Sequence, residues 1–456
     1  MELFITAIFF IGISLIATEI FNKVNKAAVA MFMGVTCWLL YIVAGRHFVL
    51  TQHLSAFLAA GYQAMATIQE VRTFIAEHVF LSYAMNAASV VLYLLGTMTI
   101  IEVLDNNGCF DFIHEALRTR RPKKFLWLIS IITFLLSANL DNLTTTCLML
   151  ALLHTMVADV ELRKRFGAIV VLAANCGGAF TVIGDVTSLS LWGVGLVTPT
   201  YYSSMLILPC MAALFTTTYL VHRKLPHSMK LVHTILPYRG DDTVLNRWQR
   251  LLMLVVGIGG LWFIPTFHRL TQLPSFVGAL CVLGVLWIVD EFCNRSLLTS
   301  DKMVSRRRPM ALQYQNLQNM LYFIGISLAV GALNETGLLQ QVAVWTTTHL
   351  HNIYIIGGLA GLLSACFNNM TVMLSDIALF RHVEHLPAFS PNGDFWPLLS
   401  YATALGGSLW LIGSTAGLAL WRMEGISFGG YLKHFMPKVL VGGLVGALVF
   451  WLTTLL

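Results

Sequence analysis

Long apolar runs separated by short polar loops recur along the whole chain. A membrane-spanning helix needs about 20 predominantly apolar residues. We expect spans at 3–21, 27–45, 79–104, 168–198, 200–221, 251–268, 274–290, 319–335, 395–421 and 438–456. The pattern therefore predicts an all-α polytopic membrane protein that has the lipid bilayer as its surroundings.

Two further apolar blocks, 125–158 and 353–380, are too long for one crossing and too short for two full ones. Clusters of Lys and Arg flank the first block on both sides, at 118–124 and 163–165. Positively charged loops stay on the cytoplasmic side, so this block should enter and leave the membrane on one side. We expect each block to be a re-entrant helical hairpin.

Lys and Arg in the other loops predict the orientation. The segments 222–250 and 291–308 are rich in them, whereas 46–78 and 336–394 are poor. The positive-inside rule places the first two in the cytoplasm and the last two outside. Residues 222–250 are therefore a predicted cytoplasmic linker, and both termini are expected on the outer side.

Composition changes this picture little, but it excludes other classes of protein. Only 11% of the residues are charged, against about 25% in soluble domains. The net charge of +6 comes from loop residues and reports topology, not nucleic-acid binding. No Walker motif is present, so we do not expect ATP-driven transport. We also expect a transporter that is not an enzyme and has no cofactor. Segments 62–78 and 108–117 are predicted interfacial amphipathic helices.

An internal repeat relates the two halves of the chain. Gly177-Gly178 lies 229 residues before Gly406-Gly407, and the hairpin tips match at an offset of 227. Each half, 1–221 and 251–456, has five expected spans and one hairpin. Because five is odd, the second half should be inverted relative to the first. Inverted repeats with broken helices near the membrane midplane are typical of secondary transporters.

Paired glycines and clustered hydroxyl groups occur inside two of the expected spans, 168–198 and 395–421. Such residues predict an unwound stretch, in which backbone carbonyls face a cavity instead of continuing the helix. We therefore expect a broken helix after each hairpin.

Two carboxylates stand out in the predicted core. Asp141 is the only carboxylate in 125–158, and Asp185 is the only charged residue in 166–221. Intramembrane carboxylates are costly unless they pair or bind a ligand, and hard cations prefer oxygen ligands. We predict a Na⁺ site at Asp141 and Asp185. The candidate neutral ligands are Asn142, Thr144, Asn175, Thr187, Ser188, Asn368, Asn369, Thr371, Ser408 and Ser414.

Structural roles compete with each of these assignments. Buried Asn, Ser and Thr often only satisfy backbone groups or join helices, and a buried Asp can be a structural hydrogen-bond acceptor. Glu102 and Glu335 end corresponding spans and are either accessory relays for protons or ions, or interfacial residues. We expect interfacial or structural roles for the remaining acidic residues near spans, which are Glu19, Asp290, Glu291 and Asp376.

Three motifs resemble the NhaD-type sodium/proton antiporters of the ion-transporter superfamily, which also contains dicarboxylate and citrate carriers. They are Leu136-Ser-Ala-Asn-Leu-Asp141-Asn142, Asn175-Cys-Gly-Gly with Gly184-Asp185-Val-Thr187, and Gly406-Gly-Ser408 with Gly413-Ser414. The resemblance implies exchange of Na⁺ or Li⁺ for H⁺ and an elevator-like movement of the hairpin domain. It also implies proton- and ion-binding roles for Asp141, Asp185, Glu102 and Glu335. A homodimer and a bacterial inner (plasma) membrane location are expected by analogy.

One position departs from that family. Its second hairpin usually carries an Asp-Asn pair, and this chain has Asn368-Asn369. A neutral Asn can coordinate Na⁺ but cannot carry a proton, so proton binding should depend on the first half.

The resulting hypothesis is competition between a proton and Na⁺ for one site, because burial favours the neutral form of a carboxyl group. Two alternatives are open at this point. A Na⁺-coupled organic-anion symporter of the same fold would bind Na⁺ and its substrate together at the hairpin tips. A channel or a membrane scaffold without transport activity is the other.

Overall fold

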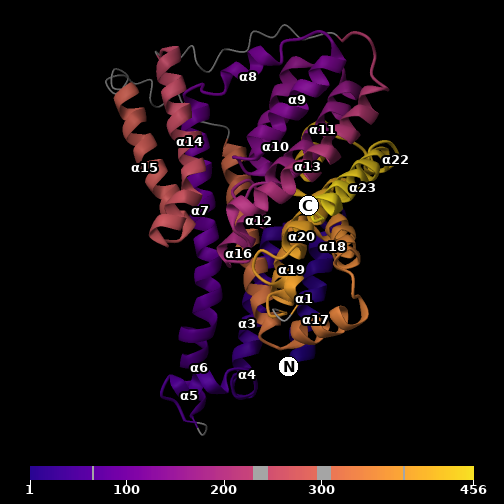
Figure 1. The fold of residues 1–456 in the computed structure, drawn as a ribbon. Helices are drawn as coiled ribbons and strands as arrows, with labels where there is room; N and C mark the ends of the chain where they lie inside the picture. Colours follow the sequence, from indigo (N-terminus) through magenta and orange to yellow (C-terminus); the bar gives the residue numbers. More distant parts are fainter. Residues whose placement is uncertain (64–65, 230–244, 295–309, 384–385, 456) are drawn as a thin grey trace.

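The computed structural model describes residues 1–63, 66–229, 245–294, 310–383 and 386–455. Within these ranges the chain is helical and has no strand, which confirms the all-α membrane class (Figure 1). Among the described residues, seven helical segments are long and apolar enough to cross a membrane. They are α3 (Lys26–Val43), α6 to α7 (Ile68–Asn106), α13 (Pro199–His222), α14 (Arg247–Thr271), α15 (Ser275–Cys293), α16 (Met310–Asn334) and α23 (Met436–Thr453).

The three other expected spans differ from a single long helix. The first is α1 (Glu2–Ala17), followed by the short α2 (Glu19–Asn22). The other two are interrupted at their glycine- and hydroxyl-rich stretches. One becomes α11 (Val160–Ala179) and α12 (Val186–Gly193), and the other becomes α20 (Phe395–Leu409) and α21 (Thr415–Glu424). Helix α11 therefore starts before the expected residue 168, because Asp159 caps it with bonds to Glu161 and Leu162.

Each expected hairpin is a pair of helices joined by a short turn. The first consists of α9 (Pro122–Ser137) and α10 (Asn142–Met156), and the second of α18 (Ile353–Phe367) and α19 (Asn369–Phe380). Figure 1 shows α9 and α10 in the upper part of the molecule and α18 and α19 in the lower part. The two hairpins thus lie in different parts of the molecule, and the inverted relation of the two halves stays a prediction.

Among the described residues, the structure does not contain the separate interfacial helix that the sequence predicted at 62–78. Residues from Ile68 onward form α6 (Ile68–Phe74), which continues through a π-helical turn (Ile75–Phe80) into α7 (Leu81–Asn106). The capping box of Thr67 and Glu70 starts the long helix. The short helices before it are α4 (Gly45–Gln52) and α5 (Leu54–Ala59). The second expected interfacial segment contains α8 (Asp111–Ala116).

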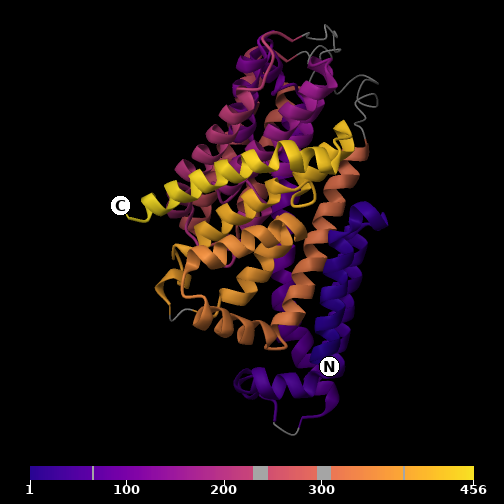
Figure 2. The same ribbon diagram turned by 90° about the vertical axis from the view of Figure 1, so that its right-hand side faces the viewer.

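The remaining elements are α17 (Leu338–His349), a 3-10 turn (Pro387–Phe389) and α22 (Phe428–His434). Helix α23 runs across the other C-terminal helices in Figure 2. Parts of two predicted cytoplasmic segments, 230–244 of the linker and 295–309, lie outside the described residues.

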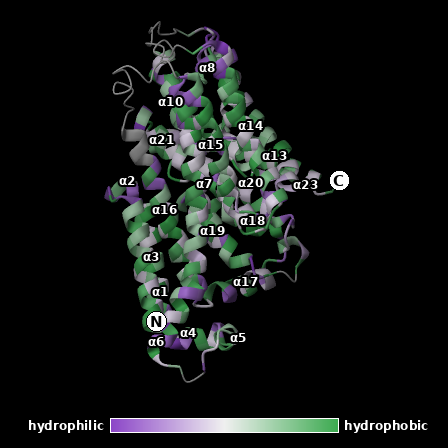
Figure 3. Ribbon diagram, turned by 90° about the vertical axis from the view of Figure 1, so that its left-hand side faces the viewer, coloured by the Kyte–Doolittle hydropathy of each residue, from purple (hydrophilic) through white to green (hydrophobic). Residues whose placement is uncertain are grey.

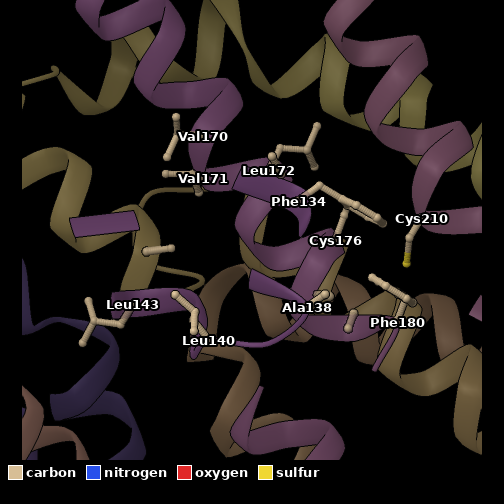
Figure 4. Packing of buried hydrophobic residues seen from close by; sticks show 14 of the residues in the cluster. Phe134, Ala138, Leu140, Leu143, Val170, Val171, Leu172, Cys176, Phe180 and Cys210 are labelled. Atoms are coloured by element: carbon tan, nitrogen blue, oxygen red, sulfur yellow. The ribbon is translucent and has the colours of Figure 1, made fainter. Parts of the chain in front are cut away.

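Buried apolar side chains form two clusters. The larger contains the first hairpin, α11 and α13, together with α20 and α23 (Figure 4). In that view Phe134 and Phe180 lie together, with ring centroids 5.0 Å apart and nearly parallel planes. The smaller cluster joins α1, α3, α7 and α16. Hydrophobic residues make up most of the helices (Figure 3), and many large ones are exposed, such as Phe32 on α3 and Phe292 on α15, as lipid contact requires.

The same packing contacts occur in both halves. Ser137 Oγ donates to the carbonyl of Ala174 at 2.7 Å, and Ser364 Oγ donates to the carbonyl of Thr403, also at 2.7 Å. In both pairs, the first helix of a hairpin contacts the adjacent broken helix. These pairs follow the offsets of 227 and 229 residues, and therefore support the predicted repeat in the hairpin regions.

A buried ion pair joins the two halves at the end of α21. The side chain of Glu424 is 1% exposed, and its two oxygens are bound by different residues. Arg163 Nε in α11 donates to Oε2 at 2.9 Å, and His154 Nδ1 in α10 lies 3.2 Å from Oε1. The first hairpin, α11 and α21 are therefore tied together at one point.

Substitution of Arg163 by Met should lower the free energy of unfolding by about 3–5 kcal/mol, because it leaves the buried Glu424 carboxylate without its cation. Denaturant unfolding of the detergent-solubilised protein measures this change. Lys164→Met is the matched control, since Lys164 pairs with the exposed Glu161 and the loss of a surface ion pair should change stability by less than about 1 kcal/mol. Equal effects of the two variants would contradict the prediction.

Candidate functional site

Both hairpin tips are helix N-caps. The Asp141 carboxylate accepts from the N–H groups of Leu143 at 3.1 Å and Thr144 at 3.4 Å, at the start of α10. Asn368, at the matching position, accepts from the N–H of Met370 at 3.1 Å and has a positive φ of 71°. Capping satisfies backbone donors that have no partner in the helix. Asp141 therefore has a structural role as well as its predicted role in ion binding.

Asn175 connects elements of both halves. Its Nδ2 donates to Ser408 Oγ at 2.9 Å and to Ser414 Oγ at 3.1 Å. Its Oδ1 accepts from Asn142 Nδ2 at 3.4 Å. All four side chains are buried. The first hairpin and both broken helices therefore meet at Asn175.

Asp185 lies at the break between α11 and α12 and contacts the second hairpin. Its Oδ2 accepts from Thr187 Oγ1 at 2.9 Å and from Asn369 Nδ2 at 3.3 Å. The Asn369 N–H also donates to the carbonyl of Gly413 at 3.0 Å, in the second break. Asp141 directly precedes Asn142, which bonds Asn175, so both carboxylates lie on elements that meet in this region. The two predicted carboxylates thus face a centre formed by both hairpin tips and both breaks.

The other predicted ligands are placed less uniformly. Thr144 Oγ1 is buried and has no hydrogen-bond partner among the described residues, as is also the case for the neighbouring Thr145 and Thr146 hydroxyls. Ser188 Oγ donates to the carbonyl of Asp185 at 2.9 Å. Thr371 turns away from the centre, because its hydroxyl pairs with Tyr322 of α16 at 2.5 Å. We therefore place Thr371 at the contact with α16.

The two accessory acidic residues are not part of this centre. Glu102 lies on α7. That helix carries none of the residues that form the hydrogen bonds around Asn175 and Asp185 described above. Glu335 follows α16 and is bound by His53, by the Tyr83 hydroxyl at 2.7 Å and by the Tyr41 hydroxyl at 3.4 Å. Glu335 is therefore a satisfied buried carboxylate at the far end of α16. Sequence reasoning missed His53, because no motif connects it with a residue so distant in the chain.

A cavity of about 640 Å³ lies between α7, α14 and α16 on one side and α12 and α19 on the other. Its polar lining includes His53, Asn86 and Glu335. Leu189 and Ser190 also line it, and they belong to α12, which starts directly after Asp185. The cavity therefore extends from His53, after the end of α4, and Glu335, after the end of α16, to α12, which starts next to the predicted ion site.

The His53–Glu335 pair makes stability depend on pH. The hydrogen bond with Glu335 raises the pKa of His53 above its usual value, against an opposing effect of burial. Since the folded-state pKa is the higher one, the stabilisation is complete below the unfolded-state pKa and disappears as the pH rises through the raised value. His53→Gln should therefore lower the melting temperature at pH 6 and have a smaller effect at pH 9. Equal losses at both values would contradict this assignment.

Comparison with known proteins places the chain among ion transporters. The citrate-transporter family CitMHS matches residues 13–383. The chain is 31% identical to sodium/proton antiporter 2 of Arabidopsis thaliana, over 97% of each protein. It is 33% identical to sodium/proton antiporter 1 of the same plant, over 79% of this chain and 61% of that protein. It is 26% identical to the Na⁺/H⁺ antiporter NhaD of Vibrio parahaemolyticus, over 82% of this chain and 91% of that protein.

Proposed function

This chain belongs to the citrate-transporter family together with NhaD-type sodium/proton antiporters, and we propose that it exchanges Na⁺ or Li⁺ for H⁺ across a membrane. The observation that carries this proposal is the centre around Asp141 and Asp185. Asp185 lies there with amide and hydroxyl groups from both hairpin tips and both breaks, and Asp141 directly precedes Asn142, which bonds Asn175 in the same centre. These are the oxygen ligands that a hard cation prefers.

The charge of this centre favours a cation over an anionic substrate. No Lys or Arg occurs in 166–221, 309–380 or 395–421, the segments that contain the breaks and the second hairpin. Two carboxylates without a nearby cation would repel a citrate-like anion. For this reason we rank Na⁺-coupled anion symport second, although the family is described as citrate transporters.

Competition at Asp141 and Asp185 would couple the two fluxes. A carboxyl group that has bound a proton is neutral and no longer offers a negative charge to Na⁺. Binding of one ion therefore releases the other. Because Asp141 and Asp185 lie on elements that meet, they would titrate as a pair. Asn142, Asn175 and Thr187 would supply neutral oxygens, and no cofactor beyond the transported ions is needed.

We further propose that the halves 1–221 and 251–456 are inverted repeats joined by the linker 222–250, with both termini outside. In this orientation the cavity beside α12 and α19 opens to the outer side. The hairpin domain consists of the two hairpins and the two broken helices. In the same orientation, its contacts with the other helices lie toward the inner side. Tyr322 of α16 bonds Thr371 of α19, and Glu19 of α2 pairs with Arg422 of α21 at 3.0 Å. These contacts support an outward-open state of an elevator-type carrier.

Exchange should therefore be measured first in everted vesicles or proteoliposomes. Na⁺ and Li⁺ should dissipate an imposed pH gradient, and K⁺ should serve as the comparison. Uptake of radiolabelled citrate or a dicarboxylate with Na⁺, in place of pH-gradient dissipation, would favour the symport alternative. Single-channel currents would favour a channel.

The elevator movement predicts that the contact between α16 and α19 must open in each cycle. Cysteines at Tyr322 and Thr371, in a background without the native cysteines, should be joined by a short bis-methanethiosulfonate reagent, which forms one disulfide with each cysteine, releases two methanesulfinates and is cleaved by a reductant. Exchange should then fall at least about tenfold and return after cleavage of the reagent. Each single cysteine, treated in the same way, is the control. Undiminished exchange by the fully cross-linked protein would refute this movement.

We propose location in a bacterial inner (plasma) membrane and a homodimer. The bacterial NhaD relative supports the first proposal, and analogy with other elevator carriers supports the second.

A further inference from the structure

Asp376 is a carboxylate of the second half that neither the predicted ion site nor the ion pairs use. It lies on α19, seven residues after Asn369, so the two residues occupy the same face of the helix, about 10.5 Å apart along its axis. Met373 and Phe380, which flank this face, are 0% and 1% exposed. Both belong to the larger apolar cluster. Asp376 therefore lies beside buried apolar side chains, although the residue as a whole is partly exposed.

The Oδ2 atom of Asp376 is buried and has no hydrogen-bond partner among the described residues. An ionised carboxylate without a partner in an apolar region costs several kcal/mol, and such groups become neutral instead. The contrast with Glu424 is direct, because that buried carboxylate has Arg163 and His154 as partners. The geometry thus indicates a neutral, protonated Asp376 in this conformation.

The titratable groups on the helices that pack against α19 have other partners. Tyr322 of α16 pairs with Thr371, Tyr401 of α20 with the carbonyl of Gly443, and Tyr354 of α18 with Thr454. His349 of α17 contacts the carbonyl of Trp345, and Asp185, before α12, accepts from Thr187 and Asn369. The groups that complete this set are Cys366, at the end of α18, and Arg381, directly after α19. Among the residues that the structure describes, no ion pair includes Asp376 or Arg381.

Water can approach α19 from the outer cavity. Leu374, Ile377 and Ala378, which surround Asp376 in sequence, line that cavity. Asp376 itself is only partly exposed. Ile377, directly after Asp376, lies about 100° further around the helix, so the route of a proton from the cavity to the partly exposed carboxyl passes around one side of α19.

We propose that Asp376 is a third proton-binding carboxyl of this exchanger and moves with the second hairpin. It gives the second half the acidic group that Asn368 and Asn369 lack. One proton from the outer water binds the carboxylate, and the same proton is released to the inner water after the hairpin domain has moved. This inference rests on the proposed Na⁺/H⁺ exchange and deepens it by assigning a further proton carrier.

The test is the H⁺/Na⁺ coupling ratio in proteoliposomes, obtained from the pH gradient that stops net Na⁺ movement. Asp376→Asn, which preserves shape and polarity, should lower the ratio by a whole proton, and Asp376→Glu should keep it. Ser375→Ala, on the adjacent position of α19, should leave the ratio unchanged. If the wild type exchanges and Asp376→Asn has the same ratio, this inference is overturned while the proposed function stands. Absence of exchange in the wild type would instead overturn the proposed function.

Infrared spectroscopy gives a second measurement that needs only folded protein. In Na⁺-free buffer the wild type should show the C=O stretching band of a protonated carboxyl group that is missing in Asp376→Asn. If that variant does not fold, a shift of this band in Asp376→Glu takes its place. A spectrum that is the same in the wild type and in the folded variant would show that Asp376 is ionised, and would overturn the inference.

Discussion

Replacement of Asp141 by Asn is expected to lower Na⁺-dependent proton exchange at least about 100-fold, since loss of only about 2.8 kcal/mol of ion stabilisation gives that factor. The amide cannot bind or release a proton, so competition between Na⁺ and H⁺ at this oxygen ends. Asp185→Asn should have the same effect, because Asp185 is the other carboxylate of the centre and is 5% exposed. Dissipation of a pH gradient in vesicles measures both.

Asp141→Asn is a sharp test, because the variant removes the negative charge but should keep the N-cap of α10 and therefore the stability of the fold. Asn is as good an N-cap as Asp, and Asn368 already caps the equivalent helix α19. The variant should therefore keep its melting temperature to within a few degrees. Asn368→Asp is the reciprocal variant, which adds a carboxylate at the matching tip. Full exchange by correctly folded Asp141→Asn or Asp185→Asn would refute the assignment of these residues.

Gly406→Ala is expected to destabilise the protein by at least about 3 kcal/mol or to prevent its folding, since overpacking against backbone cannot be relieved by a side-chain rotation. A Cβ atom at Gly406 would lie 1.9 Å from the carbonyl oxygen of Gly361 in α18. The corresponding contact in the first half is between Gly177 and the carbonyl oxygen of Phe134, 2.3 Å from an ideal Cβ. Both glycines let a hairpin approach its broken helix closely.

The matched control for Gly406→Ala is Gly358→Ala on α18, where a Cβ meets no atom within 4 Å. That change should be neutral or stabilise the helix by up to about 1 kcal/mol. Thermal unfolding followed by size-exclusion chromatography in detergent compares the two variants. Equal melting temperatures would mean that α18 and α20 are not packed as closely as the structure shows.

The spans and hairpins follow from local properties of the sequence. The seven long apolar helices lie within or around expected spans, because hydrophobic length is a property of a contiguous segment. The hairpin turns lie at Asp141 and Asn368 for a similar reason, since a capping residue followed by an apolar run is a local signal. The prediction of a separate interfacial helix at 62–78 is wrong, because the helix that starts there continues into α7. Amphipathic character does not distinguish an interfacial helix from the end of a long one.

The sequence by itself determined that two carboxylates lie in apolar segments and that neutral oxygens recur at matching positions of the two halves. Only the tertiary structure decided which of these groups meet. Asn175 bonds Ser408 and Ser414, which are 233 and 239 residues away, whereas Thr371 turns to Tyr322 and Glu335 to His53. The physical reason is that the free-energy cost of burying a polar side chain depends on the residue itself and can be seen in the sequence. The partner that offsets this cost depends on how distant helices pack, which the sequence does not show.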